Sequence, residues 1–504
     1  MAGVNMEKKM YSRREFMIIA TAGLTAAALG NNCGCNMFAK KRRPNFVFIL
    51  IDDLGWKDVG VYGSSFYETP HIDSLAEQGM RFTDAYAACP VCSPTRASIM
   101  TGKYPARVGI TDWIPGDDPK NRKLLGPKDR HELPLEEKTI AEALVEVGYK
   151  SGFFGKWHLG DKGYYPEQQG FQLNKGGHWA GHPASYFYPY KNESKRWDVP
   201  DLEGGKAGEY LTDRLTDEAI AFMRAHQDDP FLIFLSHYAV HTPIQSKKEL
   251  AEKYKMKVAG NPPLDGPDYL PERGSTSKQK QDDPAYAGMV ESVDESVGRI
   301  MAELEKLGLE KDTVIVFMSD NGGLSTQSQG RMSPTSNVPL RAGKGWLYEG
   351  GIREPMIIKW PGKVRPGSVC SLPVISTDFY PTMLEIAGLG LLKEQHVDGE
   401  NLVPLLKEQV DENGWQREAI FWHFPHYHSS GQTPSAAVRA GRYKLIEWFE
   451  GGSVELYDLK EDIGETRDLA KAMPDKRDEL LGMLRRWREE VGAKLPQPNP
   501  DYKE

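Results

Sequence analysis

The feature that most constrains the fold is a repeated order of one buried strand followed by one amphipathic helix. Residues 45–53, NFVFILIDD, form a continuous apolar run that ends in two aspartates, which is typical of a central strand buried on both faces. Helix-like segments and further short apolar runs alternate in residues 139–160, 213–241 and 290–323. This alternation predicts a parallel sheet that is covered by helices on both faces.

The character of the sequence changes after about Leu406. Three segments then resemble short strands with no helix between them, namely residues 419–428, 435–449 and 454–462. Residues 476–492 have the pattern of a single helix. We therefore predict an α/β domain in residues 44–406, with a large, mixed and mostly parallel sheet sandwiched by helices. Residues 407–504 are predicted to form a smaller antiparallel sheet with one helix.

Residues 1–43 are expected to be an export signal and a linker. Arg13 and Arg14 precede a weakly apolar run that is too short to span a bilayer as a helix. The paired arginines resemble a twin-arginine signal, and a Sec-type signal is the alternative. Lipidation of Cys33 or Cys35 stays open, although neither follows the short motif expected before a lipidated cysteine. We predict an exported protein that is periplasmic, at the cell surface or extracellular.

Charge and cysteine content narrow the possible functions. The net charge of −8, without a basic patch, argues against nucleic acid as a partner, although a locally positive site can still bind an anion. Beyond the signal, Cys89, Cys92 and Cys370 are too few for a disulfide framework. From the residues alone, Cys92 can be a disulfide partner, a metal ligand, a redox partner of Cys89, a nucleophile or the precursor of another functional group.

Polar side chains follow four predicted strands at the point where each strand ends. They are Asp52 and Asp53, Lys156 and His158, His237 and His241, and Asp320 and Asn321. In an open α/β sheet, sites form beyond the carboxyl ends of the strands. Three carboxylates and an amide oxygen suit Ca²⁺ or Mg²⁺ better than zinc. A cation surrounded by Lys, Arg and His predicts a site for a charged oxyanion ester.

Residues 92–105 resemble the sulfatase signature C-x-P-x-R followed by T-G-K-Y-P, with Cys92, Pro94 and Arg96 at the required offsets. Further blocks occur in family order: FILIDDLGWKDVG, GKWHLG, VHTP, MSDNGG, GKGWLYEGGIREPMIIKWPG and LYDLKED. From about Pro44 to its end, the chain is similar to type I formylglycine-dependent sulfatases of the alkaline phosphatase superfamily. Within that family it looks closest to bacterial exported sulfatases related to N-acetylgalactosamine-sulfatase and arylsulfatase A.

The resemblance implies that a maturation enzyme oxidises Cys92 to formylglycine. An aldehyde hydrate carries two hydroxyl groups, so that one can attack sulfur and the other can expel sulfate by C–O cleavage, whereas a serine or cysteine ester would need a second attack at sulfur. Ca²⁺, in preference to Mg²⁺, would be bound by Asp52, Asp53, Asp320, Asn321 and modified Cys92. The other implied roles are that Arg96 holds the hydrate, Lys156 and Lys344 neutralise sulfate oxygens, His158 assists sulfate release, His241 protonates the leaving alcohol, and Lys103 supports these residues.

Two segments rich in aromatic residues and histidine, residues 176–190 and 421–430, predict a carbohydrate substrate, because aromatic rings with polar tips suit sugars. From them we expect His178, His182, His423 and His426 to bind substrate. The predicted activity is exo-acting removal of O-sulfate from galactose or N-acetylgalactosamine in a glycan. The alternatives are an arylsulfatase of broad specificity, a metal-dependent phosphoester hydrolase, and an inactive glycan-binding protein. The predicted partners are the glycan or a small sulfate ester, the maturation enzyme and the twin-arginine export machinery, without nucleic acid.

Overall fold

The computed structural model describes residues 42–117, 119–192, 197–260, 266–328, 330, 332–410 and 414–503. The predicted export signal, including Arg13, Arg14, Cys33 and Cys35, lies outside these residues. Residues Arg43–Glu504 form one compact unit, and the predicted boundary at Leu406 stays a prediction. In the described part of the chain, no helix has both the length and the apolar character needed to cross a membrane.

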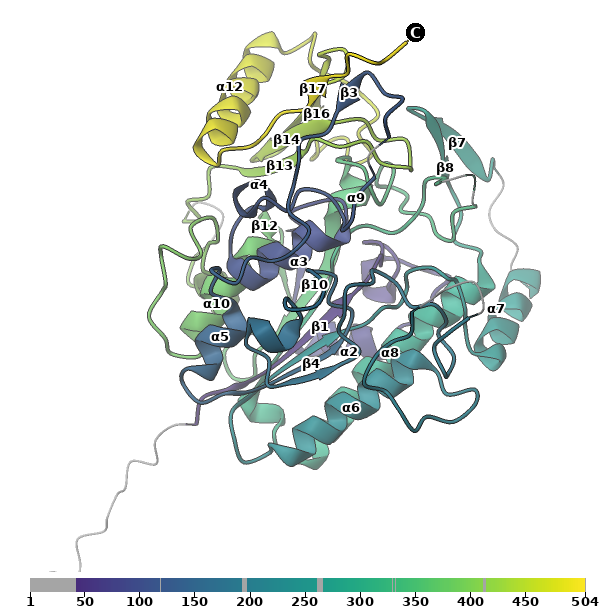
Figure 1. Ribbon diagram of the computed structural model, residues 1–504, viewed down its shortest axis with the longest axis vertical. Helices are drawn as coiled ribbons and strands as arrows, with labels where there is room; N and C mark the ends of the chain where they lie inside the picture. Colours follow the sequence, from purple (N-terminus) through teal and green to yellow (C-terminus); the bar gives the residue numbers. More distant parts are fainter. Residues whose placement is uncertain are drawn as a thin grey trace, which may run out of the picture. The chain divides into compact units, whose positions relative to one another are not determined.

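A nine-stranded sheet forms the centre of this unit, with the order β11-β2-β10-β9-β1-β6-β4-β5 and with β12 paired to β2 (Figure 1). Among these strands β10 alone is antiparallel to its neighbours, β9 and β2, and the other pairs are parallel. The mixed, mostly parallel sheet predicted from the sequence is therefore confirmed. The strands are β1 Asn45–Ile51, β2 Met80–Tyr86, β4 Lys150–Gly155, β5 Leu173–Lys175, β6 Phe231–Ser236, β9 Thr313–Ser319, β10 Arg353–Lys359, β11 Ser368–Cys370 and β12 Val374–Ile375.

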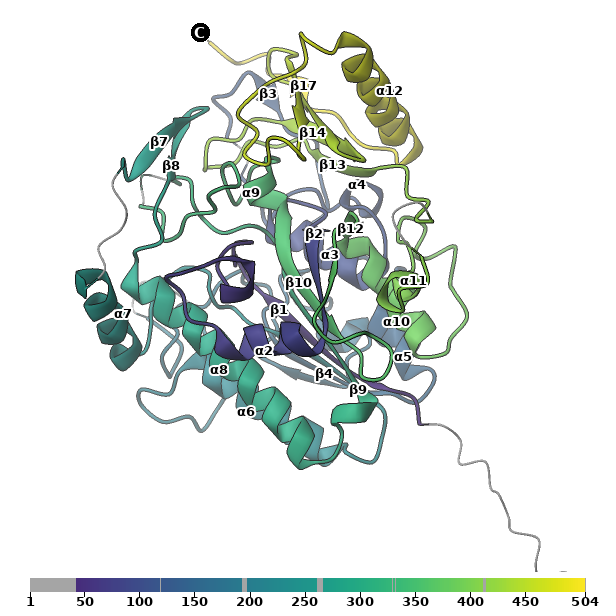
Figure 2. The ribbon, with the colours of Figure 1, turned by 180° about the vertical axis from the view of Figure 1, so that it is seen from behind.

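Strand β1 is apolar throughout because its side chains alternate between two layers of helices. Phe48 and Leu50 share a core with α3, α5 and α10, whereas Val47 and Ile49 share a core with α2, α6 and α8 (Figure 2). The sheet is thus covered on both faces, as predicted. The helices of the two layers are α3 Cys92–Thr101, α5 Ile140–Val145, α10 Phe379–Ile386, α2 Pro70–Gln78, α6 Leu211–Ala225 and α8 Pro284–Lys306.

A second sheet of four antiparallel strands lies near the carboxyl end of the chain, in the order β13-β14-β15-β16 (Figure 1). Its strands are β13 Ile420–Phe424, β14 Ser435–Ala440, β15 Tyr443–Trp448 and β16 Val454–Asp458, and helix α12 is Pro474–Glu490. Trp422 and Leu445 of this sheet and Leu484 of α12 share one core with Tyr86 of β2 and Trp346. The small sheet is therefore packed against the large one through a continuous apolar contact.

The remaining elements are helix α7 and a set of short strands, helices and turns. Two two-stranded ribbons pair β3 Leu124–Leu125 with β17 Gln497–Pro498 and β7 Tyr269–Glu272 with β8 Ser275–Lys278. The other α-helices are α4 Pro105–Val108, α7 Lys248–Gly260, α9 Glu349–Ile352 and α11 Val403–Leu406, and the 3₁₀ turns are Gly60–Tyr62, Pro166–Gln169, Glu310–Asp312 and Ser376–Asp378. Helix α9 matters for the site because it follows the loop that carries Lys344.

Candidate active site

Four neighbouring parallel strands end at one edge of the large sheet and carry most of the predicted site residues. The register pairs Leu50 of β1 and Gly155 of β4 with Ser236 of β6, and Ile51 of β1 with Ser319 of β9. The residues that follow these strands therefore lie together at that edge. They are Asp52 and Asp53 after β1, Asp320 and Asn321 after β9, Lys156 and His158 after β4, and His237 and His241 after β6.

Helix α3 brings the signature residues to the same edge. Cys92 is the first residue of α3, and Arg96 lies four residues later, on the same face of the helix. Arg96 Nε donates to Asp320 Oδ2 at 2.8 Å. Arg96 Nη1 donates to the Lys156 carbonyl at 2.7 Å and to Ser236 Oγ at 2.6 Å. These charge-assisted bonds hold the amino end of α3, and with it Cys92, against the ends of β4, β6 and β9.

Each carboxylate at the edge of the sheet is paired with a cation. Lys156 Nζ lies 2.7 Å from Asp52 Oδ2, and both side chains are fully buried. Lys344 Nζ lies 2.7 Å from Asp53 Oδ1, which also accepts a bond of 2.8 Å from Asn321 Nδ2. Burial raises the pKa of Asp52, and the charges of Asp320 and Asp53 raise it further. Burial alone would also raise the pKa of Asp53, but Lys344 and His241 lower it below its ordinary value.

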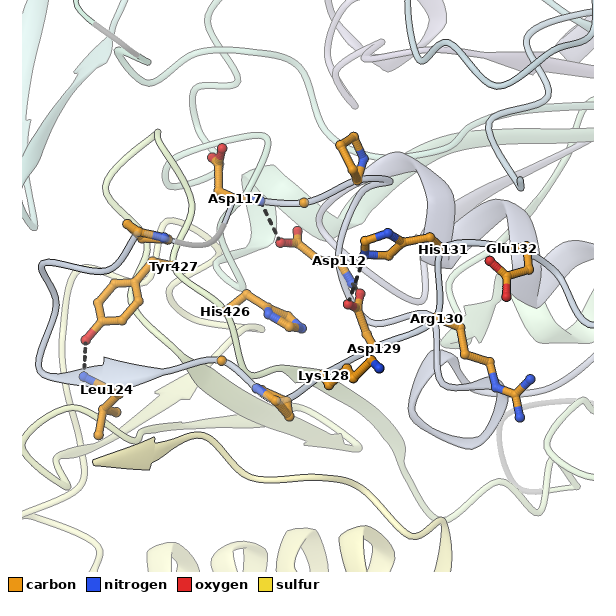
Figure 3. A pocket seen from close by; sticks show the side chains of 15 residues that line it. Asp112, Asp117, Leu124, Lys128, Asp129, Arg130, His131, Glu132, His426 and Tyr427 are labelled. Carbon is orange, nitrogen blue, oxygen red and sulfur yellow. Dashed lines mark hydrogen bonds and ion pairs between the residues drawn. The ribbon is translucent and has the colours of Figure 1, made fainter. Parts of the chain in front are cut away.

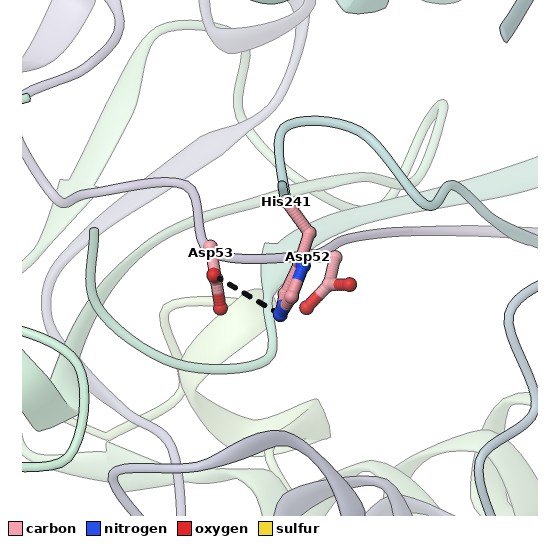
Figure 4. Close-up of side chains that lie close together, drawn as sticks. All are labelled: Asp52, Asp53 and His241. Atoms are coloured by element: carbon pink, nitrogen blue, oxygen red, sulfur yellow. Dashed lines mark ion pairs between the residues drawn. The ribbon is translucent and has the colours of Figure 1, made fainter. Parts of the chain in front are cut away.

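The donor set at this edge fits a divalent cation. Asp52 Oδ1 and Asn321 Oδ1 are buried and have no hydrogen-bond partner among the described residues. Ligand atoms of Asp52, Asp53 and His241 lie within 4.8 Å of one another (Figure 4), as do those of Asp52, Cys92 and Asp320. Buried oxygen atoms without partners carry a large desolvation cost, which a hard cation would offset. The residues present therefore suit a metal ion with oxygen ligands.

His158 faces Cys92 in a defined tautomer. His158 Nδ1 lies 3.2 Å from Cys92 Sγ, and His158 Nε2 lies 2.5 Å from the Ile114 carbonyl oxygen. Because a carbonyl oxygen only accepts, the proton of the neutral ring must be on Nε2, and Nδ1 is left as an acceptor. Burial, followed by the charge of Lys156, lowers the pKa of His158 well below its ordinary value. A neutral histidine thus presents an unprotonated nitrogen, a hydrogen-bond acceptor, to residue 92.

A cavity of about 560 Å³ opens over these groups. The predicted residues that line it are Asp53, Cys92, His158, His182, His241 and Lys344. Trp113, Trp179 and Trp197 also line it. Trp179 and Trp197 pack edge to face at 5.4 Å between ring centroids, and His182 stacks on His241 at 5.8 Å. The cavity therefore combines cationic and imidazole groups with broad aromatic surfaces.

Several predicted residues lie elsewhere. Lys103 pairs with Glu137 at 2.7 Å and is not among the described residues that line the cavity. Lys156 is fully buried behind Asp52, so contact with sulfate stays a prediction for it. His178 does not line the cavity either, and its carbonyl accepts the His158 N–H at 3.2 Å. His237 bonds Ser296 of α8 at 2.9 Å, which makes it part of the helix packing.

The second aromatic segment reaches the cavity at a different residue from those predicted. His423 Nε2 bonds the Lys494 carbonyl at 2.8 Å, and His426 Nε2 bonds Thr111 Oγ1 at 2.8 Å beside a separate cavity (Figure 3). Among the described residues of this segment, His428 and Ser429 line the active-site cavity whereas His423 and His426 do not, so contact of these two histidines with substrate stays a prediction. Gly345, with φ of +86°, permits the position of His428, because a Cβ there would lie 2.1 Å from His428 Nδ1.

Trp113, Trp179, Trp197 and His428 line the cavity but were not among the site residues predicted from the sequence. Trp179 and His428 lie inside the two segments rich in aromatic residues and histidine, which is the signal that marks them. No pattern marks Trp113 or Trp197, because each is an isolated tryptophan in an irregular stretch. Their place at the cavity depends on loop geometry alone.

Comparison with known proteins agrees with this geometry. The family model described as "Sulfatase" matches residues 44–389, and one described as "N-sulphoglucosamine sulphohydrolase, C-terminal" matches residues 342–489. N-acetylgalactosamine-6-sulfatase of Rattus norvegicus is 31% identical over 80% of this chain and 71% of its own length. Arylsulfatase A of Homo sapiens is 30% identical over 94% of this chain and 90% of its own.

A solved structure, "Crystal structure of Ps i-CgsB in complex with k-i-k-neocarrahexaose", matches with a TM-score of 0.71 and 32% identity, covering 92% of this chain and 95% of that one. Sulfatases generally use a formylglycine and a divalent metal ion, which is consistent with Cys92 beside a buried set of oxygen ligands. The family match over most of the chain, together with relatives of this identity and coverage, shows that the chain belongs to the sulfatase family and is a sulfatase.

Proposed function

We propose that this protein is a carbohydrate sulfatase that removes O-sulfate from galactose or N-acetylgalactosamine at an exposed end of a glycan. The observation that carries the proposal is one cavity that holds Cys92, His158 and Lys344 and is walled by Trp113, Trp179 and Trp197. Indole rings suit the apolar face of a pyranose, and the imidazole groups suit its hydroxyl rim. Similarity to N-acetylgalactosamine-6-sulfatases supports the choice of sugar.

We propose Ca²⁺ as the metal ion, held by Asp52, Asp53, Asp320 and Asn321 together with modified Cys92. A divalent cation there would polarise a sulfate oxygen and stabilise negative charge in the transition state. The donor set favours Ca²⁺ over zinc because it is made of carboxylate and amide oxygens. Elemental analysis of the purified protein by mass spectrometry checks this: calcium should be present, and zinc in its place would favour the phosphoester-hydrolase alternative.

The protein's own side chains bind the ester and move protons. Lys344 lines the cavity and would neutralise a sulfate oxygen, since burial opposes but Asp53 maintains its charged state. His158 Nδ1 faces residue 92, and it would accept the proton of the second hydroxyl of the formylglycine hydrate when the C–O bond breaks and sulfate is released. His241 Nδ1 lies 3.0 Å from the Thr242 carbonyl and donates to it, so that Nε2 is left for the leaving oxygen. A sulfate bound nearby would raise the pKa of His241, which burial and Lys344 lower.

The substrate proposal is tested by offering the mature enzyme sulfated galactose, N-acetylgalactosamine and glucosamine beside an aryl sulfate and a sugar phosphate. We expect the galactose-type sulfates to have the highest kcat/KM, measured by released sulfate. Cleavage of the aryl sulfate alone would exclude the carbohydrate assignment and leave a broad arylsulfatase. Release of phosphate with no release of sulfate would overturn the sulfatase mechanism.

With the same set of substrates, His241→Asn tests whether His241 acts as the acid for the leaving group or only binds substrate. A sugar alkoxide is a poor leaving group, so kcat for the best sugar sulfate should fall roughly 10²- to 10⁴-fold, whereas an aryl sulfate with an acidic phenol should lose less than about tenfold. His226→Asn is the matched control, because His226 lies at the carboxyl end of α6 and is not among the described residues that line either cavity, and it should leave both rates unchanged. Equal losses on both substrates in His241→Asn would contradict the role of His241 as acid.

A further inference from the structure

A loop that nothing in the sequence singled out contributes residues to the active-site cavity and to a second cavity of about 590 Å³, and the second cavity is drawn in Figure 3. Trp113, Ile114 and Pro115 of this loop line the active-site cavity, whereas Asp112 and Asp117 line the second cavity, as Pro115 also does. The wall between the two cavities is therefore thin. The position of the loop decides how Trp113, Ile114 and Pro115 line the active-site cavity.

The main chain of Ile114 connects the loop to Ser93 and His158, which both lie next to residue 92. Its N–H donates to Ser93 Oγ at 3.2 Å, and Ser93 directly follows Cys92. Its carbonyl accepts the proton of His158 Nε2 at 2.5 Å. This second bond fixes the tautomer of His158 and turns His158 Nδ1 toward residue 92. The main chain of Ile114 thus contributes to the active site although its side chain has no reactive group.

The side chain of Asp112 forms hydrogen bonds to both ends of this loop. Asp112 is buried with 1% exposure, although it carries a carboxylate. One carboxylate oxygen, Oδ1, accepts the Trp113 N–H at 2.8 Å, and the other, Oδ2, accepts the Asp117 N–H at 3.2 Å. The Asp112 N–H in turn donates to Asp129 Oδ2 at 3.2 Å, which anchors the loop to the facing segment (Figure 3). A single carboxylate therefore joins the two ends of residues 113–117, with Ile114 between them.

We propose that Asp112 is a positioning residue for sulfate ester hydrolysis: it keeps the Ile114 carbonyl on His158 Nε2, so that Nδ1 remains the proton acceptor that faces residue 92. The role in hydrolysis rests on the function proposed above for His158. Two oxygens that both accept are required, because the loop presents two N–H donors. An asparagine in this place accepts at one atom only, and its amide group opposes the other donor.

The test uses Asp112→Asn in the full chain, with Glu132→Gln as the matched control, since Glu132 is a carboxylate of the same second cavity for which no contact with the loop is seen. For Asp112→Asn, kcat should fall on the order of ten- to a hundredfold with KM changed less than about threefold, because a misplaced base slows chemistry more than binding. Glu132→Gln should match the wild type. A wild-type kcat in Asp112→Asn, or an increase in KM alone, would overturn the proposal.

A spectroscopic readout separates positioning from general loss of structure. Long-range ¹H–¹⁵N correlation of ¹⁵N-histidine protein, assigned with His158→Asn, should show a protonated Nε2 in the wild type and a mixture of tautomers in Asp112→Asn. The measurement needs no turnover and works on protein that retains the Cys92 thiol, so it can fail or succeed independently of the proposed function. An unchanged tautomer would refute the proposal. If Asp112→Asn does not fold, Ser93→Ala, which removes the other anchor of Ile114, should give the same change, and an unchanged spectrum would again refute it.

Discussion

Cys92→Ser should lower steady-state turnover by on the order of 10⁴-fold or more while the protein remains folded. Serine is close in size to cysteine, and Cys92 is buried at the start of α3, so the packing should survive. Serine carries a single hydroxyl group and cannot form the hydrate, so a sulfated serine would have to be attacked again at sulfur. Initial rates on the best sugar sulfate, with a thermal melt to confirm folding, measure the effect. Retention of more than a few per cent of activity would contradict the formylglycine proposal.

The modification itself is observable in one peptide. Trypsin should release residues 82–96, which contain both Cys89 and Cys92, and in active enzyme from the native host the aldehyde should map to Cys92. The signature offsets of Pro94 and Arg96 apply to Cys92 alone, and Cys92 lines the cavity whereas Cys89 is buried beside Thr95. Cys89→Ser is therefore the control, and it should keep both the modification and the activity. Two unmodified cysteines in fully active enzyme would exclude the mechanism.

Lys444→Met should destabilise the protein by about 3–5 kcal/mol, because it removes one partner from a buried ion network. Lys444 Nζ lies 2.9 Å from Glu349 Oε1 and 2.9 Å from Glu465 Oε1, and all three side chains are fully buried. Burial would raise the pKa of Glu349, but Lys444 and two arginines lower it to about 2. Methionine fills a similar volume without charge, and the two carboxylates would then face each other without this cation.

The loss of folding stability in Lys444→Met should grow as pH rises. The direction of this pH dependence follows from the protons bound by the folded and unfolded states. Burial already raises the pKa of Glu465 to about 7, and without Lys444 the folded-state pKa of Glu465 should lie still further above its unfolded value. The folded variant then binds more protons than the unfolded chain, so its stability is lost as pH rises through that window. Urea unfolding at pH 5.5 and pH 8 should show the larger deficit at pH 8.

Lys460→Met provides the control for this substitution. Lys460 lies exposed on the turn after β16, and its replacement should change stability by no more than about 0.5 kcal/mol. Equal unfolding midpoints for the two variants, or a deficit that shrinks as pH rises, would contradict the structural role of Lys444. Glu349 is the first residue of α9, five residues after Lys344, so a loss of activity in the folded variant would also be consistent with a displaced Lys344.

The sequence by itself determined the class of fold, the polar residues at the strand ends and the signature around Cys92. The apolar run of β1 reports burial on both faces, and the aspartates after it must lie at the carboxyl edge of a parallel sheet. The offsets of Pro94 and Arg96 from Cys92 carry the resemblance to the signature, whereas the helix that places Cys92 and Arg96 on one face is a finding of the structure. The strands and their ends could be predicted because periodicity and strand ends are local properties of the chain.

Only the tertiary structure decided the contacts between residues that are far apart in the sequence. It brought His428, Trp113 and Trp197 to the cavity and buried Lys444 between two glutamates. It also placed Asp112 where its carboxylate accepts hydrogen bonds from both ends of the loop whose Ile114 carbonyl contacts His158. A local pattern cannot specify such contacts, because each depends on how irregular loops and separate sheets pack, and the burial that makes them strong exists only once those segments have met.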